Sequence, residues 1–106
     1  MVERTINREI LESINKFVEE AKKYYNVKVV ILFGSYAKGT ENENSDIDIA
    51  IISEDFEDVY DCIAHLMGLT WNIDTRIEPH PITKEDFDTV SNLFVKEVIE
   101  TGIQVA

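Results

Sequence analysis

Two linked stretches decide the fold of this chain: Leu32-Phe33-Gly34-Ser35-Tyr36-Ala37-Lys38-Gly39-Thr40 and Ser45-Asp46-Ile47-Asp48-Ile49-Ala50-Ile51-Ile52. The first closes an apolar run that begins at Val27, and the second opens another apolar run. Short apolar runs bounded by turn-forming residues are typical of buried strands. The sequence therefore predicts strands over Val27–Phe33 and Asp46–Ile52, with a single helical turn over Ser35–Lys38.

Two carboxylates open the second predicted strand. Residues i and i+2 of a strand point to the same face, so Asp46 and Asp48 are expected side by side, while the intervening isoleucines face a core. Like charges placed together are destabilising unless a cation neutralises them. Mg²⁺ prefers oxygen ligands and binds through one or two carboxylates together with substrate phosphates. We therefore expect a metal site at Asp46 and Asp48.

The Gly34-Ser35 pair ends the first predicted strand. Gly34 has no Cβ, so a ligand can approach its backbone closely. The Ser35 hydroxyl and the N–H groups of the turn are donors for phosphate oxygens. Lys38 either reaches a nucleotide phosphate as a point charge or is an exposed loop lysine. Phosphate donors at one strand end and metal ligands on the next strand together indicate a site for a metal and a nucleotide.

The motif G-S-Y-A-K-G-T, followed by S-D-I-D-I-A, resembles the nucleotidyltransferase domain of the DNA polymerase β superfamily, and in particular its small minimal nucleotidyltransferases. The predicted order of elements extends this resemblance over nearly the whole chain. The resemblance implies an α/β (α+β) fold of the polymerase β type, with a small mixed sheet flanked by helices, in one domain over residues 1–106. We expect three or more strands, with the helices packed on one side.

This resemblance also implies a reaction. Members of the family transfer NMP from an NTP to an acceptor hydroxyl, and ATP is the expected nucleotide here. Carried onto this chain, the family's motif assigns Gly34, Ser35 and Lys38 to nucleotide binding. It assigns Asp46 and Asp48 to catalysis and to the binding of two Mg²⁺ ions. A third carboxylate on a neighbouring strand completes the metal site in the family and acts as a base toward the acceptor.

The third carboxylate has two candidates. Alternating apolar and polar residues over Thr70–Pro79 predict a third strand that places Asp74, Arg76 and Glu78 on one face. Glu78 is favoured as the catalytic and metal-binding residue, because its spacing to the next predicted helix resembles the family's. Arg76 either neutralises these acids or contacts nucleotide phosphates. His80 is expected on an extended loop, where a role as a base is the less favoured interpretation.

Helical periodicity predicts three longer helices. They are expected over Asn7–Tyr25, over 55–67 with Ser53 as N-cap and Gly68 as C-cap, and from Thr83 to Gly102. The second of these helices is predicted to bury one apolar face, made of Phe56, Val59, Tyr60, Ile63, Ala64 and Met67.

Composition narrows the functional classes. The 106 residues carry 21 acidic and 10 basic side chains, a net charge of −11, and show no basic cluster. Because nucleic-acid binding depends on Lys and Arg contacts to phosphates, direct binding to nucleic acid is not expected. The sequence has one cysteine, Cys62, and no apolar run of membrane-spanning length. A cytoplasmic protein without membrane attachment is therefore expected.

The acceptor stays open at this point. Similar minimal proteins often work with a small helical HEPN-type partner, and some modify that partner as the antitoxin of a toxin–antitoxin pair. A nucleotidyltransferase acting on such a partner is the favoured interpretation. The alternatives are a module that binds and neutralises a helical partner with little or no catalysis, and a transferase for a small molecule such as an antibiotic. A homo-oligomer is compatible with each of these.

Overall fold

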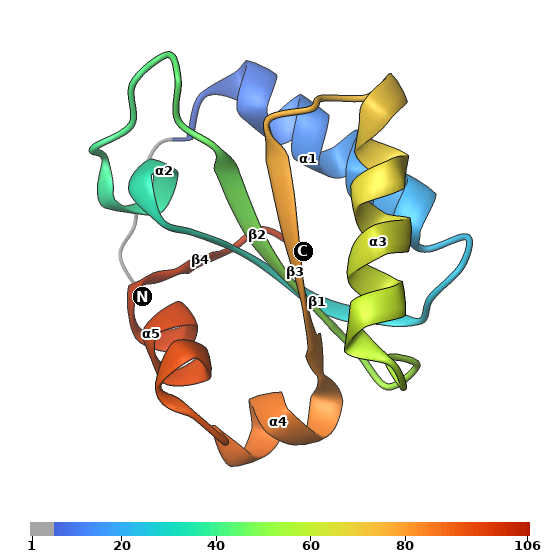
Figure 1. Cartoon of the computed structure of the whole chain (residues 1–106). Helices are drawn as coiled ribbons and strands as arrows, with labels where there is room; N and C mark the ends of the chain where they lie inside the picture. Colours follow the sequence, from blue (N-terminus) through green and yellow to red (C-terminus); the bar gives the residue numbers. More distant parts are fainter. Residues whose placement is uncertain (1–5) are drawn as a thin grey trace.

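The structure, a computed structural model, describes residues 6–106. Its elements follow in the order α1 (Arg8–Ala21), β1 (Val27–Phe33), α2 (Ser35–Lys38), β2 (Ile47–Ser53), α3 (Val59–Leu69), η1 (Thr70–Asn72), β3 (Ile77–Thr83), α4 (Lys84–Thr89), α5 (Leu93–Thr101) and β4 (Ile103–Gln104). The four strands form one sheet in the order β3-β2-β1-β4 (Figure 1). Within the described part, residues 6–106, no helix combines the length and the apolar character needed to cross a membrane.

The sheet is mixed, as the resemblance to the polymerase β superfamily implies. β1 pairs antiparallel with both β2 and β4, whereas β2 and β3 are parallel. Phe33 at the end of β1 is opposite Asp48 on β2, and Asp48 is opposite Glu78 on β3. One end of the sheet therefore collects the end of β1 and the beginnings of β2 and β3 (Figure 1).

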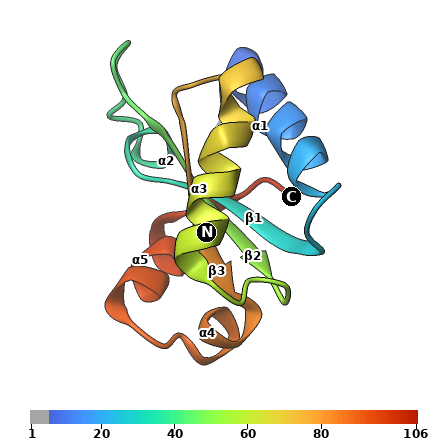
Figure 2. The same ribbon diagram turned by 45° about the vertical axis from the view of Figure 1, so that its right-hand side comes forward.

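Helices cover both faces of the sheet, so the expectation that they pack on one side is wrong. Helices α1 and α3 lie over one face, and α4 and α5 lie over the other (Figure 2). Side chains of alternate positions in β1 and β2 enter separate cores: Leu32 and Ile49 contribute to the first, and Ile31 and Ala50 to the second. Apolar residues at consecutive positions of both strands require cover on both faces, which explains the second helical layer.

The third strand lies later in the chain than the alternation predicts. Residues Thr70–Asn72 continue from α3 as a 3-10 turn, in which the backbone N–H groups of Ile73 and Asp74 donate to the Thr70 carbonyl. The strand itself, β3, runs from Ile77 to Thr83 and contains two prolines. Because β3 is an edge strand, it can include prolines without losing hydrogen bonds to β2.

The second predicted helix has different ends and a different buried face. α3 begins at Val59, because Asp58 caps it by accepting from two backbone N–H groups. The predicted cap Ser53 is instead the fully buried last residue of β2, and Gly68 lies inside the helix. Of the residues within α3, Cys62 and Leu66 are buried, and the predicted apolar face is exposed apart from Phe56, which precedes the helix.

The remaining helices follow the sequence more closely. Asn7 caps α1 by accepting from the Glu9 N–H, although the helix ends at Ala21 rather than near Tyr25. The last predicted helix is divided in two, because the chain adopts a left-handed conformation at Val90, with φ of 47°, and Asn92 caps α5 anew. Its outer limits hold: Thr83 caps α4 through the Asp86 N–H, and Gly102 follows α5.

Candidate active site

The candidate site is built where β1, β2 and β3 meet at one end of the sheet. Gly34, directly after β1, has φ of 73°, a conformation that residues with a Cβ rarely adopt. A Cβ built on Gly34 would lie 2.5 Å from Oδ2 of Asp48. The turn that carries Gly34 and Ser35 is therefore packed directly against the Asp48 carboxylate. Both the left-handed turn and this close approach explain why the motif contains glycine.

Three potential metal ligands come together beside this turn. Asp48 and Glu78 are register partners on parallel strands, and His80 follows Glu78 on the same face of β3. Nε2 of His80 is 3.4 Å from Oδ1 of Asp48 and 3.8 Å from Oε1 of Glu78. One ligand atom from each of the three residues lies within 4.8 Å of the others.

The carboxylates of this cluster repel one another. Burial raises the pKa of Glu78, and the nearby charge of Asp48 raises it further. His80 lowers that pKa, and Asp46, which also approaches Glu78, raises it. The raised pKa means that the protein alone does not offset the cost of burying the Glu78 negative charge beside other carboxylates. A cation bound among these oxygens would remove this cost, so the donor set fits Mg²⁺.

Asp46 lies at the mouth of the same site. It is exposed and immediately precedes β2, which begins at Ile47 rather than at Asp46 as predicted. Asp46 and Glu78 both line a cleft of about 570 Å³ along the outer edge of β3. Ile63 and Met67 of α3 form the apolar wall of that cleft. The site thus extends from the Gly34 turn, across Asp48 and Glu78, to a cleft beside α3.

Asp74 lies outside this site, so the predicted common face for Asp74, Arg76 and Glu78 is wrong. Oδ1 of Asp74 accepts from Nε of Arg76 at 3.0 Å, and Oδ2 accepts from Nη2 of the same guanidinium group at 2.8 Å. The hydroxyl of Ser13 donates to the same carboxylate at 2.9 Å. Hydrogen bonds from Arg76 lower the pKa of Asp74 to about 2. Asp74 and Arg76 therefore form an ion pair within the turn, and the Ser13 hydroxyl joins this pair to α1.

Ser35 and Lys38 both lie on α2. Ser35 is its half-buried first residue, directly after Gly34. Lys38 is half exposed, and its Nζ is 3.5 Å from Oε1 of Glu97 on α5. An exposed pair of this kind contributes little stability. The Lys38 ammonium group is therefore not held strongly by Glu97.

His80 belongs to the site although the sequence predicts a loop residue there. Its ring packs edge-on against Phe33, with ring centroids 5.0 Å apart, and contacts Phe94 of α5 at 5.7 Å. The missed signal is the spacing Glu78-x-His80, which places both side chains on one face once β3 is correctly located.

Comparison with known protein families gives an independent view of the chain. The family described as polymerase beta, nucleotidyltransferase matches residues 15–106. A protein of Methanocaldococcus jannaschii named as a candidate protein adenylyltransferase is 34% identical over 103 residues, which cover 90% of this chain and 92% of that relative. A second protein of the same kind and organism is 49% identical over 43 residues, 41% of this chain and 50% of the relative. Against this second relative and two others, the chain spans about half of their length.

Solved structures share the fold at lower identity. One is described as a toxin–antitoxin with AMP-PNP, with a TM-score of 0.63 and 24% identity over 91% of this chain and 72% of the other. Another is described as the toxin–antitoxin MntA–HepT, with a TM-score of 0.62 and 21% identity over 94% of this chain and 72% of the other.

Proposed function

This chain belongs to the polymerase β family of nucleotidyltransferases, and from this premise we propose that it transfers AMP from ATP to a hydroxyl group on a partner protein. One observation carries the proposal: Gly34, Asp48 and Glu78 adjoin one another across three strands. The turn at Gly34, which would bind phosphates, thereby lies next to the carboxylates of Asp48 and Glu78, whose mutual repulsion a cation would relieve. Relatives named as candidate protein adenylyltransferases support the choice of AMP and of a protein acceptor.

In this proposal the nucleotide and the acceptor approach Asp48 from opposite sides. The phosphates of ATP lie at the Gly34–Ser35 turn on the β1 side, where Lys38 adds positive charge. The acceptor hydroxyl enters from the cleft on the β3 side, next to Glu78. Its oxygen attacks the α-phosphorus, and the bond from that phosphorus to the bridging oxygen of the β-phosphate breaks. The acceptor proton passes to a carboxylate of the site, and pyrophosphate leaves.

Asp46, Asp48 and Glu78 are the residues that would hold two Mg²⁺ ions. When bound, Mg²⁺ would supply neutralisation of phosphate charge and a lowered pKa of the acceptor hydroxyl. The protein side chains fix the position of these charges, because Asp48 and Glu78 are held in register by the β2–β3 ladder. The raised pKa of Glu78 supports this role, since the site is built at a cost that a bound cation removes.

An exposed apolar surface beside the cleft supports a protein as the acceptor. Val59, Ile63 and Met67 follow one another at four-residue spacing on α3, and each is between 36% and 39% exposed. Tyr60 and Trp71, the other members of this surface, are 85% and 77% exposed. We call these five residues the α3 ridge. Because Ile63 and Met67 also line the cleft, a partner lying on the ridge would reach Glu78 directly.

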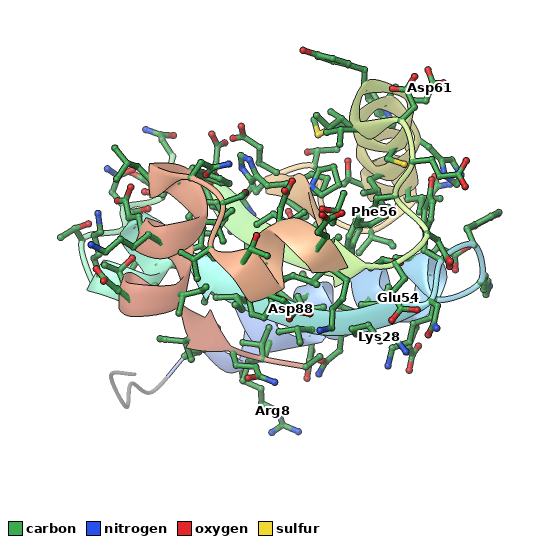
Figure 3. The ribbon with its side chains drawn as sticks, turned by 90° about the horizontal axis from the view of Figure 1, so that it is seen from below. Arg8, Lys28, Glu54, Phe56, Asp61 and Asp88 are labelled. Carbon is green, nitrogen blue, oxygen red and sulfur yellow. The ribbon has the colours of Figure 1, made fainter. Side chains whose placement is uncertain are left out.

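Charge indicates what kind of partner would fit the α3 ridge. The helix begins among acidic residues, and Asp61 points outward from α3 (Figure 3). Glu57 and Asp58, which directly precede Val59, are also exposed, so the N-terminal end of the ridge is negative, and a partner with basic residues beside an apolar patch is complementary. The toxin–antitoxin complexes among similar structures support a small helical partner of the HEPN type, modified by this chain in an antitoxin role.

The test uses ATP labelled at the α-phosphate, Mg²⁺ and protein fractions from the native source. The expected result is a labelled protein that carries AMP on a Ser, Thr or Tyr hydroxyl, identified by mass spectrometry. Asp48→Asn should abolish the label, while Asp88→Asn, an exposed substitution on α4, should retain it. Labelling that persists in Asp48→Asn, or Mg²⁺-dependent ATP binding without transfer to any protein or small molecule, would contradict the proposal.

A further inference from the structure

We propose that His80 is a direct ligand of the metal ion held by Asp48 and Glu78, and that this site consequently prefers a divalent transition ion such as Mn²⁺ over Mg²⁺. The inference rests on the proposed function only in placing a metal at this site. It adds a nitrogen ligand to a set of oxygen ligands, and it changes the class of ion that the site selects.

The spacing of the three side chains carries this inference. Ligands about 2.1 Å from one ion, in tetrahedral or octahedral arrangement, lie about 3.0–3.5 Å from each other. Nε2 of His80 is 3.4 Å from Oδ1 of Asp48, which already meets this spacing. Its distance to Oε1 of Glu78 is 3.8 Å, and the three ligand atoms all lie within 4.8 Å of one another. The Glu78 side chain is 46% exposed, so it has room to move toward a bound ion.

The surroundings of His80 hold the ring toward the carboxylates. Phe33 on one side and Phe94 on another contact the imidazole, and they come from β1 and α5. The backbone of His80 is fixed by the pairing of β3 with β2, where Ala50 is its partner. The ring is thus packed in place with its Nε2 atom within hydrogen-bond distance of Oδ1 of Asp48, so the same atom already faces the proposed metal position.

The chemistry of the donor set then determines selectivity. Mg²⁺ takes oxygen ligands and retains water, so an imidazole nitrogen adds little to its binding. Imidazole suits first-row transition ions such as Fe²⁺, Ni²⁺, Cu²⁺ and Zn²⁺, and the affinity of a mixed nitrogen and oxygen site increases from Mn²⁺ toward Cu²⁺. Mn²⁺ also suits carboxylates, and as the weakest binder of this series it is the stringent probe of a nitrogen ligand. The set Asp48, Glu78 and His80 should therefore favour Mn²⁺ even in a protein that also binds Mg²⁺.

The experiment measures metal binding by the whole chain without nucleotide. Mn²⁺ binding is followed by the loss of the free-ion electron paramagnetic resonance signal, and Mg²⁺ binding by calorimetry. Pulsed resonance on the Mn²⁺ complex then reports coupling to an imidazole ¹⁴N nucleus. His80→Phe keeps the aromatic packing, and His80→Gln provides a second variant if the first unfolds. His65→Gln is the matched control, because His65 lies on α3 and pairs with the Tyr25 hydroxyl.

We expect the wild-type chain to bind Mn²⁺ about tenfold or more tightly than Mg²⁺ and to show ¹⁴N coupling. The His80 variants should lose the coupling and about tenfold or more of the Mn²⁺ affinity, with Mg²⁺ affinity changed little. His65→Gln should match the wild type. Wild-type Mn²⁺ binding without ¹⁴N coupling, or coupling that persists in the His80 variants, would overturn the inference.

The outcome is independent of AMP transfer. Nitrogen coupling in a protein that labels no acceptor would preserve the inference and count against the proposed function. Transfer of AMP by a protein whose Mn²⁺ complex lacks the coupling would do the reverse.

Discussion

Gly34 and Asp48 are packed so closely that a Cβ on Gly34 would lie 2.5 Å from Oδ2 of Asp48. The pairing of Phe33 with Asp48 across β1 and β2 sets this approach, and Gly34 has a positive φ at the point of contact. The backbone of the proposed phosphate site and the side chain of the proposed metal site are thus mechanically coupled. A change at either residue should be felt at the other.

Gly34→Ala tests this coupling. The added methyl group would clash with the Asp48 carboxylate, and the alanine backbone would be strained at the positive φ of this position. We therefore expect a loss of about 2 kcal/mol or more in the free energy of unfolding, and weaker ATP binding. Gly68→Ala is the matched control, because a Cβ there meets no atom within 4 Å. Within α3 it should stabilise the protein by about 0.5–1 kcal/mol. Chemical denaturation and ATP titration measure both effects, and equal stability of the two variants would refute the coupling.

Glu78→Gln should separate stability from activity. A carboxyl whose folded-state pKa is raised destabilises the folded protein when ionised, and this loss is relieved as the pH falls through the raised pKa. The neutral glutamine should therefore raise the melting temperature of the metal-free protein at pH 7. AMP transfer should fall by about a hundredfold or more. Thermal unfolding and the labelling assay check this, and a lower melting temperature in the variant would contradict it.

Asp74→Asn should have the opposite profile. The pKa of Asp74 is lowered to about 2 in the folded protein, and its side chain is 10% exposed. Its ion pair therefore contributes stability above the unfolded pKa of about 3.9 and loses it as the pH falls through about 2. We expect the variant to be less stable by about 2 kcal/mol at neutral pH and less sensitive to acid below pH 4. AMP transfer should be retained, and its loss would restore Asp74 as a candidate third carboxylate.

Ile63→Glu tests the α3 ridge as the acceptor surface. Ile63 is 36% exposed and lines the cleft, so a charged side chain there would be buried by the apolar patch of the acceptor and should weaken its binding, with little effect on the stability of the protein alone. Labelling of the acceptor should fall about tenfold, with ATP binding unchanged. Leu93→Glu, at an 82% exposed position on α5, is the control and should label normally. A similar loss in both variants would show that added charge, rather than the α3 ridge, causes the effect.

The sequence predicts the centre of this fold well because strong local signals agree there. The bounds Val27–Phe33 and Ser35–Lys38 match β1 and α2, since an apolar run ends at a glycine that must take a positive φ. The family resemblance is confirmed by the match over residues 15–106. The roles of Asp46, Asp48, Gly34, Ser35, Lys38 and Glu78 stay predictions.

Other parts of the fold depend on tertiary contacts that periodicity does not report. The alternation over Thr70–Pro79 resembles a strand, but the Asp74–Arg76 pair holds this segment as a turn against Ser13. The sequence predicts the wrong buried face for α3 because apolar residues surround most of this helix, and only packing selects Cys62 and Leu66 for the core. His80 could be placed in the site only after β3 was located.

The two prolines of β3 decide how other chains can approach this protein. The Arg76 carbonyl accepts from the Ile47 N–H, so the backbone groups of Pro79 and Pro81 fall on the outward side of the strand. Proline has no N–H, and this edge therefore cannot template a further strand. Edge-to-edge pairing with a strand of another molecule is therefore blocked beside the site, although the same edge stays open to side chains. A partner therefore reaches the carboxylates there through side-chain contacts rather than by adding a strand to the sheet. The site stays accessible, and its edge strand does not promote aggregation.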